Sequence, residues 1–418
     1  MKIFKFGGAS VNSIERIKSM AAIVDQYSNE QILIIVSAMG KTTNALEKVV
    51  EAFYAGNKEQ ALQLFDTIKK QHLTTSKYLL VTTFNHCLAQ LSEFFTEVEW
   101  LLHDKPVREF DYYYDQIVSI GELFSTSIIS HYLNEVGITN NWIDVRDLVK
   151  TDNNFRDATI DFIESSDKIK KAIPIDGKTM YLTQGFIGCT DENESTTLGR
   201  EGSDFTAAIF ANILNAESVT IWKDVEGVMN ADPKEFPDAQ LIEELSFNEV
   251  IEMAYYGAQV IHPKTIKPLQ NKQIPLLVKC FLQPHLPGTI IHNTKNKNLP
   301  PIIVHKQNQV LIELVSQDFS FVGEKHMAEL YQILAHIKIK PNLIQTGAIN
   351  IQICLDDKVE KIDQLATAAS TIFDTHIEKG LKLLSIRHYT TDSIENLLKE
   401  KEVVLEQKTK STIQVLYK

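Results

Sequence analysis

The sequence predicts an α/β fold, with an open, mostly parallel sheet that carries helices on both faces, followed by a smaller α+β region. Three observations support this prediction. Apolar runs, glycine-containing turns and helical patterns alternate twice within the first sixty residues, as in β-turn-α units. The same alternation returns after a glycine-free helical stretch at about 58–116. A polar, proline-ended stretch at 292–301 then has the composition of a linker, and shorter units follow it.

The first two units place two loops at one edge of the predicted sheet. Short apolar runs predict strands at 2–6 (KIFKF) and 31–38 (QILIIVSA), and apolar residues at helical spacing predict helices at 13–27 and 45–56. Alternation of this kind gives parallel strands with helices on the sheet faces. Both intervening loops therefore lie at the carboxyl ends of strands, where open α/β sheets bind ligands.

A helical insertion and further strands complete the first region. Apolar residues at helical spacing occupy 59–73 and 87–102, so helices are expected there. Strand signals return at 181–188, 219–225 and 275–282, with helical patterns at 205–214 and 247–258. One large α/β domain over residues 1–295 accounts for all of these elements.

The C-terminal region has a different pattern of short alternating elements. Its strand-like segments are 310–316, 349–355, 381–389 and 412–417, and its helical segments are 326–337, 359–373 and 391–400. A region of this size can fold independently. Residues 304–418 are therefore expected to form an α+β domain.

Composition limits the possible functions and partners. The 418 residues are 44% apolar and 23% charged, with a formal net charge of −12, which is typical of a soluble globular protein and argues against nucleic-acid binding. No segment reaches the roughly 18 consecutive apolar residues of a membrane helix, and the N-terminus turns into a glycine loop too early for a secretory signal. We therefore expect a cytoplasmic protein without a membrane partner.

The cysteines predict neither a metal site nor a disulfide framework. The spacings CxxC and CxH are absent from the sequence, and such spacings are what zinc sites usually show. Reduced, buried thiols are expected in a protein of this class. The four cysteines are Cys87, Cys189, Cys280 and Cys354.

The first glycine loop, KFGGAS, has features of an anion site. Lys5 precedes the strand exit, and Gly7 and Gly8 let the backbone approach a ligand closely and present N–H groups to it. Ser10 could cap the following helix. The loop is neither a GxxxxGK[ST] phosphate loop nor a GxGxxG dinucleotide turn, so a simple strand-to-helix turn is the alternative.

The stretch TLGREGSD (197–204) gathers charged and polar side chains around two glycines. The fork of Arg200 suits a carboxylate or a phosphate. A helix that opens just after Ser203 and Asp204 would point free N–H groups the same way. The alternative is a structural salt bridge between Arg200 and a nearby carboxylate.

Taken in order, several loops resemble those of the aspartokinases, within the amino-acid-kinase fold. The matching segments are KFGGAS, VSAMGKTTN, SIGE, TQGFIG, TLGREGSD, WKDVEGVMNADPK and YYGAQVIHPKT. The resemblance covers nearly the whole chain. It implies phosphorylation of the side-chain carboxylate of L-aspartate by ATP with Mg²⁺, to give aspartyl phosphate for lysine, threonine and methionine synthesis.

The resemblance assigns roles to the phosphate and substrate residues. Lys5 is expected to contact the transferring phosphoryl group, Gly7 and Gly8 the phosphates, and Asp204 to hold Lys5 or the metal. The attacking carboxylate is already ionised at neutral pH, so no general base is needed. On the substrate, Arg200 is expected to bind the α-carboxylate and Glu122 the ammonium. The residues expected to complete the substrate site are Ser37, Thr43 and Ser203.

For the nucleotide, the resemblance points to the 223–234 loop and to GAQV. The nucleotide candidates, beside Lys5, Gly7, Gly8 and Ser10, are Lys223, Asp224, Met229, Asp232, Lys234, Gln259 and Val260. Lys223, Met229 and Gln259 depart from residues common in the family, which bears on adenine recognition. Glu201 stands where some relatives have glycine, and a solvated loop charge is the expected role.

The C-terminal region resembles the regulatory ACT pair of aspartokinases, which usually binds an amino-acid effector and dimerises. Lysine or threonine is the possible effector, and a homodimer or higher homo-oligomer is expected. An ACT pair used only for dimerisation is the alternative. The effector candidates are Gly323, His326, Met327 and Asn342.

Two other functions stay open at this stage. One is a related kinase that acts on another carboxylate such as glutamate, although the helical insertion, SIGE and the ACT-like tail argue against it. The other is a catalytically silent amino-acid sensor. The presence of Lys5, Glu122, Arg200 and Asp204 together makes the aspartate kinase the leading prediction.

Overall fold

The computed structural model describes residues 1–258, 261–295, 298–318 and 320–418. The chain forms two compact units. The first comprises Met1–Val228, Leu241–Ile251 and Val260–Asn296, and the second comprises Met229–Gln240, Glu252–Gln259 and Lys297–Lys418. Among the described residues, no helix has the length and apolar content needed to cross a bilayer.

The first unit is built on an eight-stranded sheet with the order β10-β12-β11-β7-β1-β2-β4-β3. The neighbouring strands are parallel except for the antiparallel pair β11 and β12, which confirms the predicted mostly parallel sheet. The strands are β1 (Lys2–Phe6), β2 (Ile32–Val36), β3 (Asn141–Trp142), β4 (Tyr181–Gln184), β7 (Ser218–Lys223), β10 (Glu244–Ser246), β11 (Leu276–Cys280) and β12 (Thr289–His292).

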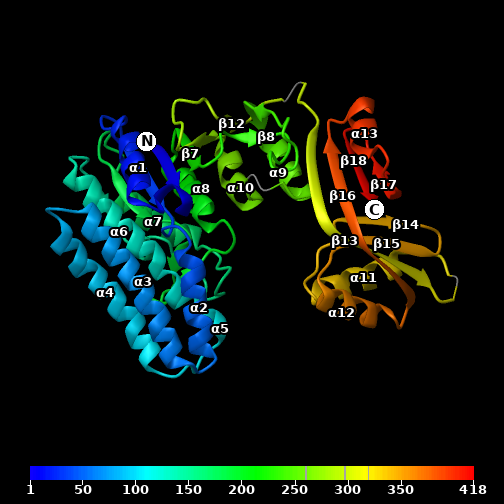
Figure 1. The fold of residues 1–418 in the computed structure, drawn as a ribbon, viewed down its shortest axis with the longest axis horizontal. Helices are drawn as coiled ribbons and strands as arrows, with labels where there is room; N and C mark the ends of the chain where they lie inside the picture. Colours follow the sequence, from blue (N-terminus) through cyan, green and yellow to red (C-terminus); the bar gives the residue numbers. More distant parts are fainter. Residues whose placement is uncertain (259–260, 296–297, 319) are drawn as a thin grey trace. The chain divides into compact units, whose positions relative to one another are not determined.

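Helices pack on this sheet and form the predicted insertion. The helix α8 contacts β1, β2 and β7, whereas α6 contacts β2, β3 and β4. The insertion helices α3 and α4 run side by side with α6, which follows the insertion (Figure 1). The helices of this unit are α1 (Ile14–Asp25), α2 (Thr42–Tyr54), α3 (Lys58–Leu79), α4 (Phe84–His103), α5 (Phe110–Val118), α6 (Ile120–Glu135), α7 (Phe162–Ala172), α8 (Gly202–Leu214) and α10 (Pro263–Lys272).

Local sequence explains where these elements begin and how they are buried. The strand β2 is a run of five β-branched or leucine residues that are all buried, as expected for a central parallel strand covered on both faces. At the start of α1, the hydroxyl of Ser13 accepts a hydrogen bond from the Arg16 N–H at 3.3 Å. At the start of α7, Asp161 accepts bonds from the N–H groups of Ile163 and Glu164. Such caps satisfy donors that the first helical turn leaves free.

Several short elements lie outside the large sheet, and one of them leads into a candidate ligand loop. The strands β5 (Ile187–Cys189) and β6 (Ser195–Thr197) form an antiparallel pair, and β6 leads into the TLGREGSD stretch. The remaining short elements are the 3₁₀ turns at Gly8–Val11 and Val145–Asp147, the strands β8 (Val228–Met229) and β9 (Leu241–Ile242), and the helix α9 (Phe247–Tyr256).

The second unit contains a six-stranded antiparallel sheet with the order β14-β15-β13-β16-β18-β17. The helices α11 and α12 bury Leu330, Leu334, Ile362 and Leu365 in a core with its strands, which confirms the predicted α+β region. Its elements are β13 (Ile302–Ser316), α11 (Glu324–His336), β14 (Leu343–Thr346), β15 (Asn350–Asp356), α12 (Val359–Ala369), β16 (Phe373–Arg387), α13 (Thr391–Leu398), β17 (Val403–Lys408) and β18 (Thr412–Tyr417).

Two segments within residues 1–295 group with this second unit. Residues 229–240 do so because Asn230 accepts a hydrogen bond from the Ile303 N–H at 2.7 Å and donates one to the Pro301 carbonyl. The segment that contains Glu252 is held by an ion pair to Arg387 at 2.8 Å. The domain ranges 1–295 and 304–418 stay a prediction, and the compact units follow the chain less simply than those ranges imply.

Candidate active site

A cavity of about 490 Å³ lies where three parallel strands end. Lys5 lies near the end of β1, Ser37 follows β2, and Lys223 is the last residue of β7. The carboxyl ends of these strands are where ligands bind in open α/β sheets. The full lining is Lys5, Ser37, Thr43, Tyr114, Glu122, Arg156, Phe186, Thr197, Gly199, Arg200, Glu201, Gly202, Ser203, Asp204 and Lys223.

An ion pair between Lys5 and Asp204 forms one wall of this cavity. The Lys5 Nζ lies 2.6 Å from Oδ1 of Asp204, and the two side chains are only 11% and 4% exposed. Burial on its own raises the pKa of Asp204, but the charges of Lys5 and Lys223 outweigh burial and leave the pKa below its usual range. Asp204 also lies in the first turn of α8, where the helix dipole favours a negative charge.

Glycines allow the first two loops to touch. A Cβ added to Gly8 would lie 2.5 Å from the Ala38 carbonyl oxygen and 3.0 Å from that of Gly40, so no larger residue fits. The Gly40 N–H donates to the Gly8 carbonyl at 3.0 Å. A Cβ on Gly7 would lie 3.5 Å from the Lys5 Nζ, so this glycine lies close beside the ammonium. The loop after β1 is therefore packed directly against the loop after β2.

The structure corrects the expected position of Ser10. The helix α1 is capped by Ser13, because a short 3₁₀ turn at Gly8–Val11 precedes the helix. The Ser10 hydroxyl is buried and donates to the Trp222 carbonyl at 3.2 Å. Ser10 thus fastens this turn to β7 and is not among the residues that line the cavity.

Glu122 presents a buried carboxylate to the cavity from the first turn of α6. The side chain is 3% exposed, and within the described chain its Oε2 has no hydrogen-bond partner. Burial raises the pKa of Glu122 to about 8, although the charge of Lys5 and a bond from the Ala38 backbone act in the opposite direction. A positive charge that enters the cavity would stabilise the ionised form of this carboxyl.

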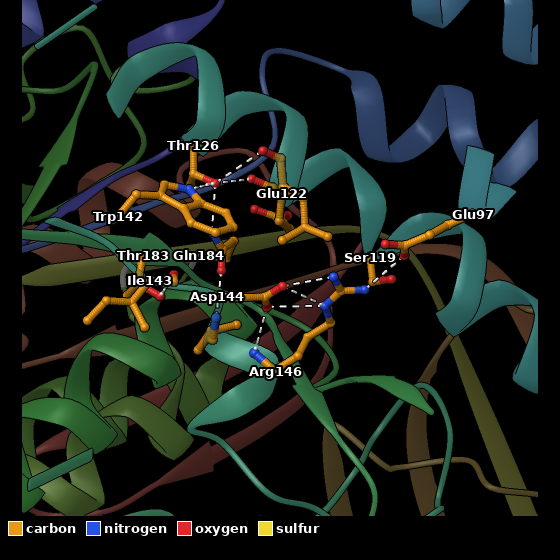
Figure 2. A network of polar contacts seen from close by, with 12 residues as sticks. Glu97, Ser119, Glu122, Thr126, Trp142, Ile143, Asp144, Arg146, Thr183 and Gln184 are labelled. Atoms are coloured by element: carbon orange, nitrogen blue, oxygen red, sulfur yellow. Dashed lines mark hydrogen bonds and ion pairs between the residues drawn. The ribbon is translucent and has the colours of Figure 1, made fainter. Parts of the chain in front are cut away.

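A polar network holds the first turns of α6 in place (Figure 2). The Thr126 hydroxyl donates to the Glu122 carbonyl at 2.9 Å and accepts from Trp142 Nε1 at 3.1 Å and from Gln184 Nε2 at 2.7 Å. The Gln184 side-chain oxygen accepts from the Val145 N–H. Since every hydrogen-bonding position of this hydroxyl is used, the helix that carries Glu122 is fixed relative to β4.

The loop before α8 presents Arg200 with its charge available to a ligand. Arg200 is exposed and lines the cavity, and in the described part of the chain no carboxylate forms an ion pair with it. The alternative of a structural salt bridge is therefore wrong for the structure. The helix α8 already begins at Gly202, so Ser203 lies in its first turn, slightly earlier than expected.

Three comparisons place these features among known proteins. Residues 1–280 match the model of the amino acid kinase family. The chain is 31% identical to aspartokinase 2, chloroplastic, of Arabidopsis thaliana, over 92% of this chain and 73% of the relative. It is 30% identical to lysine-sensitive aspartokinase 3 of Escherichia coli strain K12, over 92% and 86%.

The chain belongs to the aspartokinases of the amino acid kinase family. A crystal structure of E. coli aspartokinase III in complex with aspartate and ADP matches 100% of this chain and 96% of its own, with a TM-score of 0.83 and 27% identity. A second structure of that enzyme, with lysine and aspartate, matches with a TM-score of 0.80 and the same identity. Both structures share the fold of the two units described above.

Three residues of this aspartokinase site were not expected from the sequence. Tyr114, Arg156 and Phe186 all line the cavity, together with Thr197 at the start of the TLGREGSD stretch. The Arg156 guanidinium lies 4.3 Å from the centre of the Tyr114 ring, as in a cation–π contact. No local pattern identifies Tyr114 and Arg156, because they come from separate segments that only the fold brings together, whereas Phe186 lies within the TQGFIG segment.

Glu201 has a structural contact and is not simply a solvated charge. Its Oε2 accepts a hydrogen bond from the His262 N–H at 2.9 Å. Its backbone adopts the left-handed conformation with φ 55°, which is uncommon for a residue with a side chain. Glu201 thus fastens the substrate loop to the start of α10, since His262 caps that helix.

The structure describes only some of the residues that are expected to bind the nucleotide. Lys223 lines the cavity, whereas Asp224 is an exposed residue directly after β7. Met229, Asp232 and Lys234 belong to the second compact unit, where Asp232 accepts a bond from the Lys234 N–H. Gln259 and Val260 lie outside the described residues. The nucleotide assignments stay a prediction.

The effector candidates lie in two segments of the second unit. Gly323 is the N-cap of α11, with His326 and Met327 in the first turn. Asn342 lies directly before β14. The Asn342 side chain is engaged elsewhere, since it accepts from Lys306 and donates to Gln309 and Asp356 at 2.7–2.8 Å.

Proposed function

We propose that the protein transfers the γ-phosphoryl group of ATP to the side-chain carboxylate of L-aspartate, which gives 4-phospho-L-aspartate and ADP. This reaction is the first step of lysine, threonine and methionine biosynthesis. Support comes from relatives named aspartokinases and from the aspartate and ADP bound by the E. coli enzyme. The observation in this chain that carries the proposal is a single cavity lined by both the exposed Arg200 guanidinium and the buried Glu122 carboxylate.

Those two groups fit the two charges of an amino acid. The Arg200 guanidinium would bind the α-carboxylate, and Glu122 would bind the ammonium. Charge-assisted hydrogen bonds of this kind are the strong ones in proteins. Ser37, Thr43 and Ser203 line the same cavity and would supply further hydrogen bonds.

The other end of the cavity suits a transferring phosphoryl group. Phosphoryl transfer has a loose transition state, so positioning and fixed positive charge provide most of the catalysis. Lys5 and Lys223 line the cavity and would supply that charge, while Gly7, which lies beside the Lys5 ammonium, and Gly8 would present backbone N–H groups. Asp204 orients Lys5 through their ion pair. The attacking carboxylate is ionised at neutral pH and needs no base.

The residues of the cavity are compatible with Mg²⁺ that arrives with ATP. In the described residues, no group of three carboxylate, histidine or cysteine side chains could hold a metal by itself. Mg²⁺ usually binds through one or two carboxylates, waters and substrate phosphates, and Asp204 is the carboxylate placed for this. When bound, the ion would neutralise charge on the phosphates.

Regulation and assembly extend the proposal to the second unit. Lysine is the first effector to test, because the E. coli relative is named lysine-sensitive. Gly323, His326, Met327 and Asn342 stay the candidate contacts. A homodimer or higher homo-oligomer is the assembly that we propose.

The decisive experiment measures ADP release from ATP and Mg²⁺ with aspartate or glutamate as the acceptor. We expect turnover with aspartate and little with glutamate. Addition of lysine, threonine or methionine tests for an effector. Equal turnover with both acceptors, or none with aspartate, would contradict the proposed function.

A further inference from the structure

A fully buried carboxylate with no role in the chemistry above lies in the last turns of α5. Asp115 is 0% exposed. Its Oδ1 accepts from the Thr197 hydroxyl at 2.7 Å, and its Oδ2 accepts from the Thr197 N–H at 2.7 Å and the Arg156 N–H at 2.9 Å. Burial raises its pKa to about 6 despite these bonds. Such a group is expensive to bury, which calls for an explanation.

Both segments that Asp115 holds belong to the cavity. Thr197 and Arg156 line it, and the Ala158 N–H donates to the Thr197 carbonyl at 3.0 Å. The turn at Arg156 also supports the loop that carries Arg200, because a Cβ on Gly199 would lie 2.7 Å from Oδ1 of Asp157. One carboxylate therefore fixes the base of the expected α-carboxylate site.

The same side chain is also linked to the expected ammonium site. The helix α5 ends at Val118 and α6 begins at Ile120, with Ser119 between them in helical conformation. Asp115 and Glu122 are seven residues apart, which is about two helical turns and brings them to nearly the same face. Asp115 thus connects the element that presents Glu122 to the segments that support Arg200.

We propose that Asp115 is a positioning residue. It sets the distance between the ammonium site at Glu122 and the α-carboxylate site, which lies in the segment from Thr197 to Arg200. It acts through Thr197 and the Arg156 turn and touches no substrate. The inference rests on the proposed function, because it names the residue that spaces the two ends of the amino-acid site. Its loss should weaken aspartate binding much more than ATP binding.

The next residue along the helix provides a matched control. Gln116 donates to the Ser195 carbonyl at 2.8 Å and accepts from the Ser195 N–H at 3.0 Å. It therefore joins the same helix to the same strand, β6. Ser195 is not among the residues that line the cavity at Lys5 and Asp204. A purely structural role for Asp115 predicts similar effects from both substitutions.

The test compares Asp115→Ala, Asp115→Asn and Gln116→Ala with the wild type by kcat, by KM for aspartate and for ATP, and by Tm. We expect Asp115→Ala to raise KM for aspartate by about tenfold or more, with KM for ATP within about twofold. Asp115→Asn should recover part of the loss, because an amide can accept the backbone N–H groups and donate to the Thr197 hydroxyl. Gln116→Ala should change Tm but leave KM for aspartate within about twofold.

The Thr197→Val variant tests the same contact from the side of its partner residue. It provides the test of the proposal if Asp115→Ala does not fold. It should raise KM for aspartate, and the double variant with Asp115→Asn should be no worse than the sum of the single effects. An unchanged KM for aspartate in the Asp115 and Thr197 variants, or equal changes in Gln116→Ala, would overturn this inference alone. A wild-type protein without aspartate-dependent ADP release would overturn the proposed function and this inference together.

Discussion

Replacement of Glu122 by glutamine should make the protein more stable and less able to bind aspartate. In the unliganded protein, burial raises the pKa of Glu122 from 4.5 to about 8. The folded state therefore disfavours the ionised carboxyl, which is the form that an ammonium ligand requires. Glutamine keeps the shape of the side chain and removes the charge, so stability and binding should change in opposite directions.

The magnitude of the stability change follows from the two pKa values. Below pH 4.5 the carboxyl is protonated in both states and has no effect. Between pH 4.5 and about 8 the unfolded state loses the proton first, so the free energy of unfolding falls by about 1.4 kcal/mol per pH unit. Above about pH 8 the loss is constant. The Glu122→Gln variant lacks this loss, which amounts to about 3 kcal/mol at pH 7.

The binding change has the opposite sign. An ammonium that pairs with Glu122 must displace its proton, so kcat/KM for aspartate should rise about tenfold per pH unit up to about pH 8 and then level off. The Glu122→Gln variant should show a flat profile in this range. At pH 8 its kcat/KM for aspartate should be lower by about 10²–10³, since a buried charged partner is lost.

The assay combines urea unfolding with initial rates at half-unit steps from pH 5.5 to 9. Thr126→Val is the control for the surrounding network, because Thr126 supports the same helical turn without carrying a charge. A wild-type stability that does not fall between pH 5.5 and 8 would refute the reasoning about burial. An unchanged kcat/KM in Glu122→Gln would refute the assignment of the ammonium site.

Three further predictions concern the charges in the cavity. Lys5→Met should lower kcat by about 10³ with little change in KM for aspartate. Single-turnover rates would test this, and full activity of the variant would contradict the assignment of Lys5 to the phosphoryl group. Arg200→Lys should raise KM for aspartate by about 10–10² through loss of the bidentate fork, whereas an equal rise in KM for ATP would contradict it. Removal of Mg²⁺ with EDTA should stop ADP formation, and added Mg²⁺ should restore it; turnover in EDTA would exclude the metal.

The sequence predicted the elements whose signal is local. The run at Ile32–Val36 marks a buried parallel strand, and Lys5, Ser37 and Lys223 at or near the ends of three such strands line one cavity in the structure. The strands β14 and β17 were not predicted, because β14 has only four residues and β17 is largely exposed with a mixed charged sequence. Edge strands of this kind lack the apolar alternation on which prediction depends.

The parts of the site that were missed depend on tertiary contacts. Asp115 and Tyr114 come from the helical insertion, and their relation to Thr197 appears only when α5 packs beside β6. Ser10 was wrongly expected to cap a helix because the sequence does not reveal that a 3₁₀ turn intervenes. Glu201 was expected to be solvated, since its partner is a backbone N–H sixty-one residues away.

The close contact of Gly8 with Ala38 and Gly40 has a consequence for substrate choice. Because these two backbones touch and share a hydrogen bond, neither loop can retreat while the other stays in place. The distance between the phosphate-binding end and the amino-acid-binding end of the cavity is therefore fixed. An acceptor longer by one methylene would place its carboxylate too far forward, so discrimination against glutamate would come from rigidity and not from a repelling side chain.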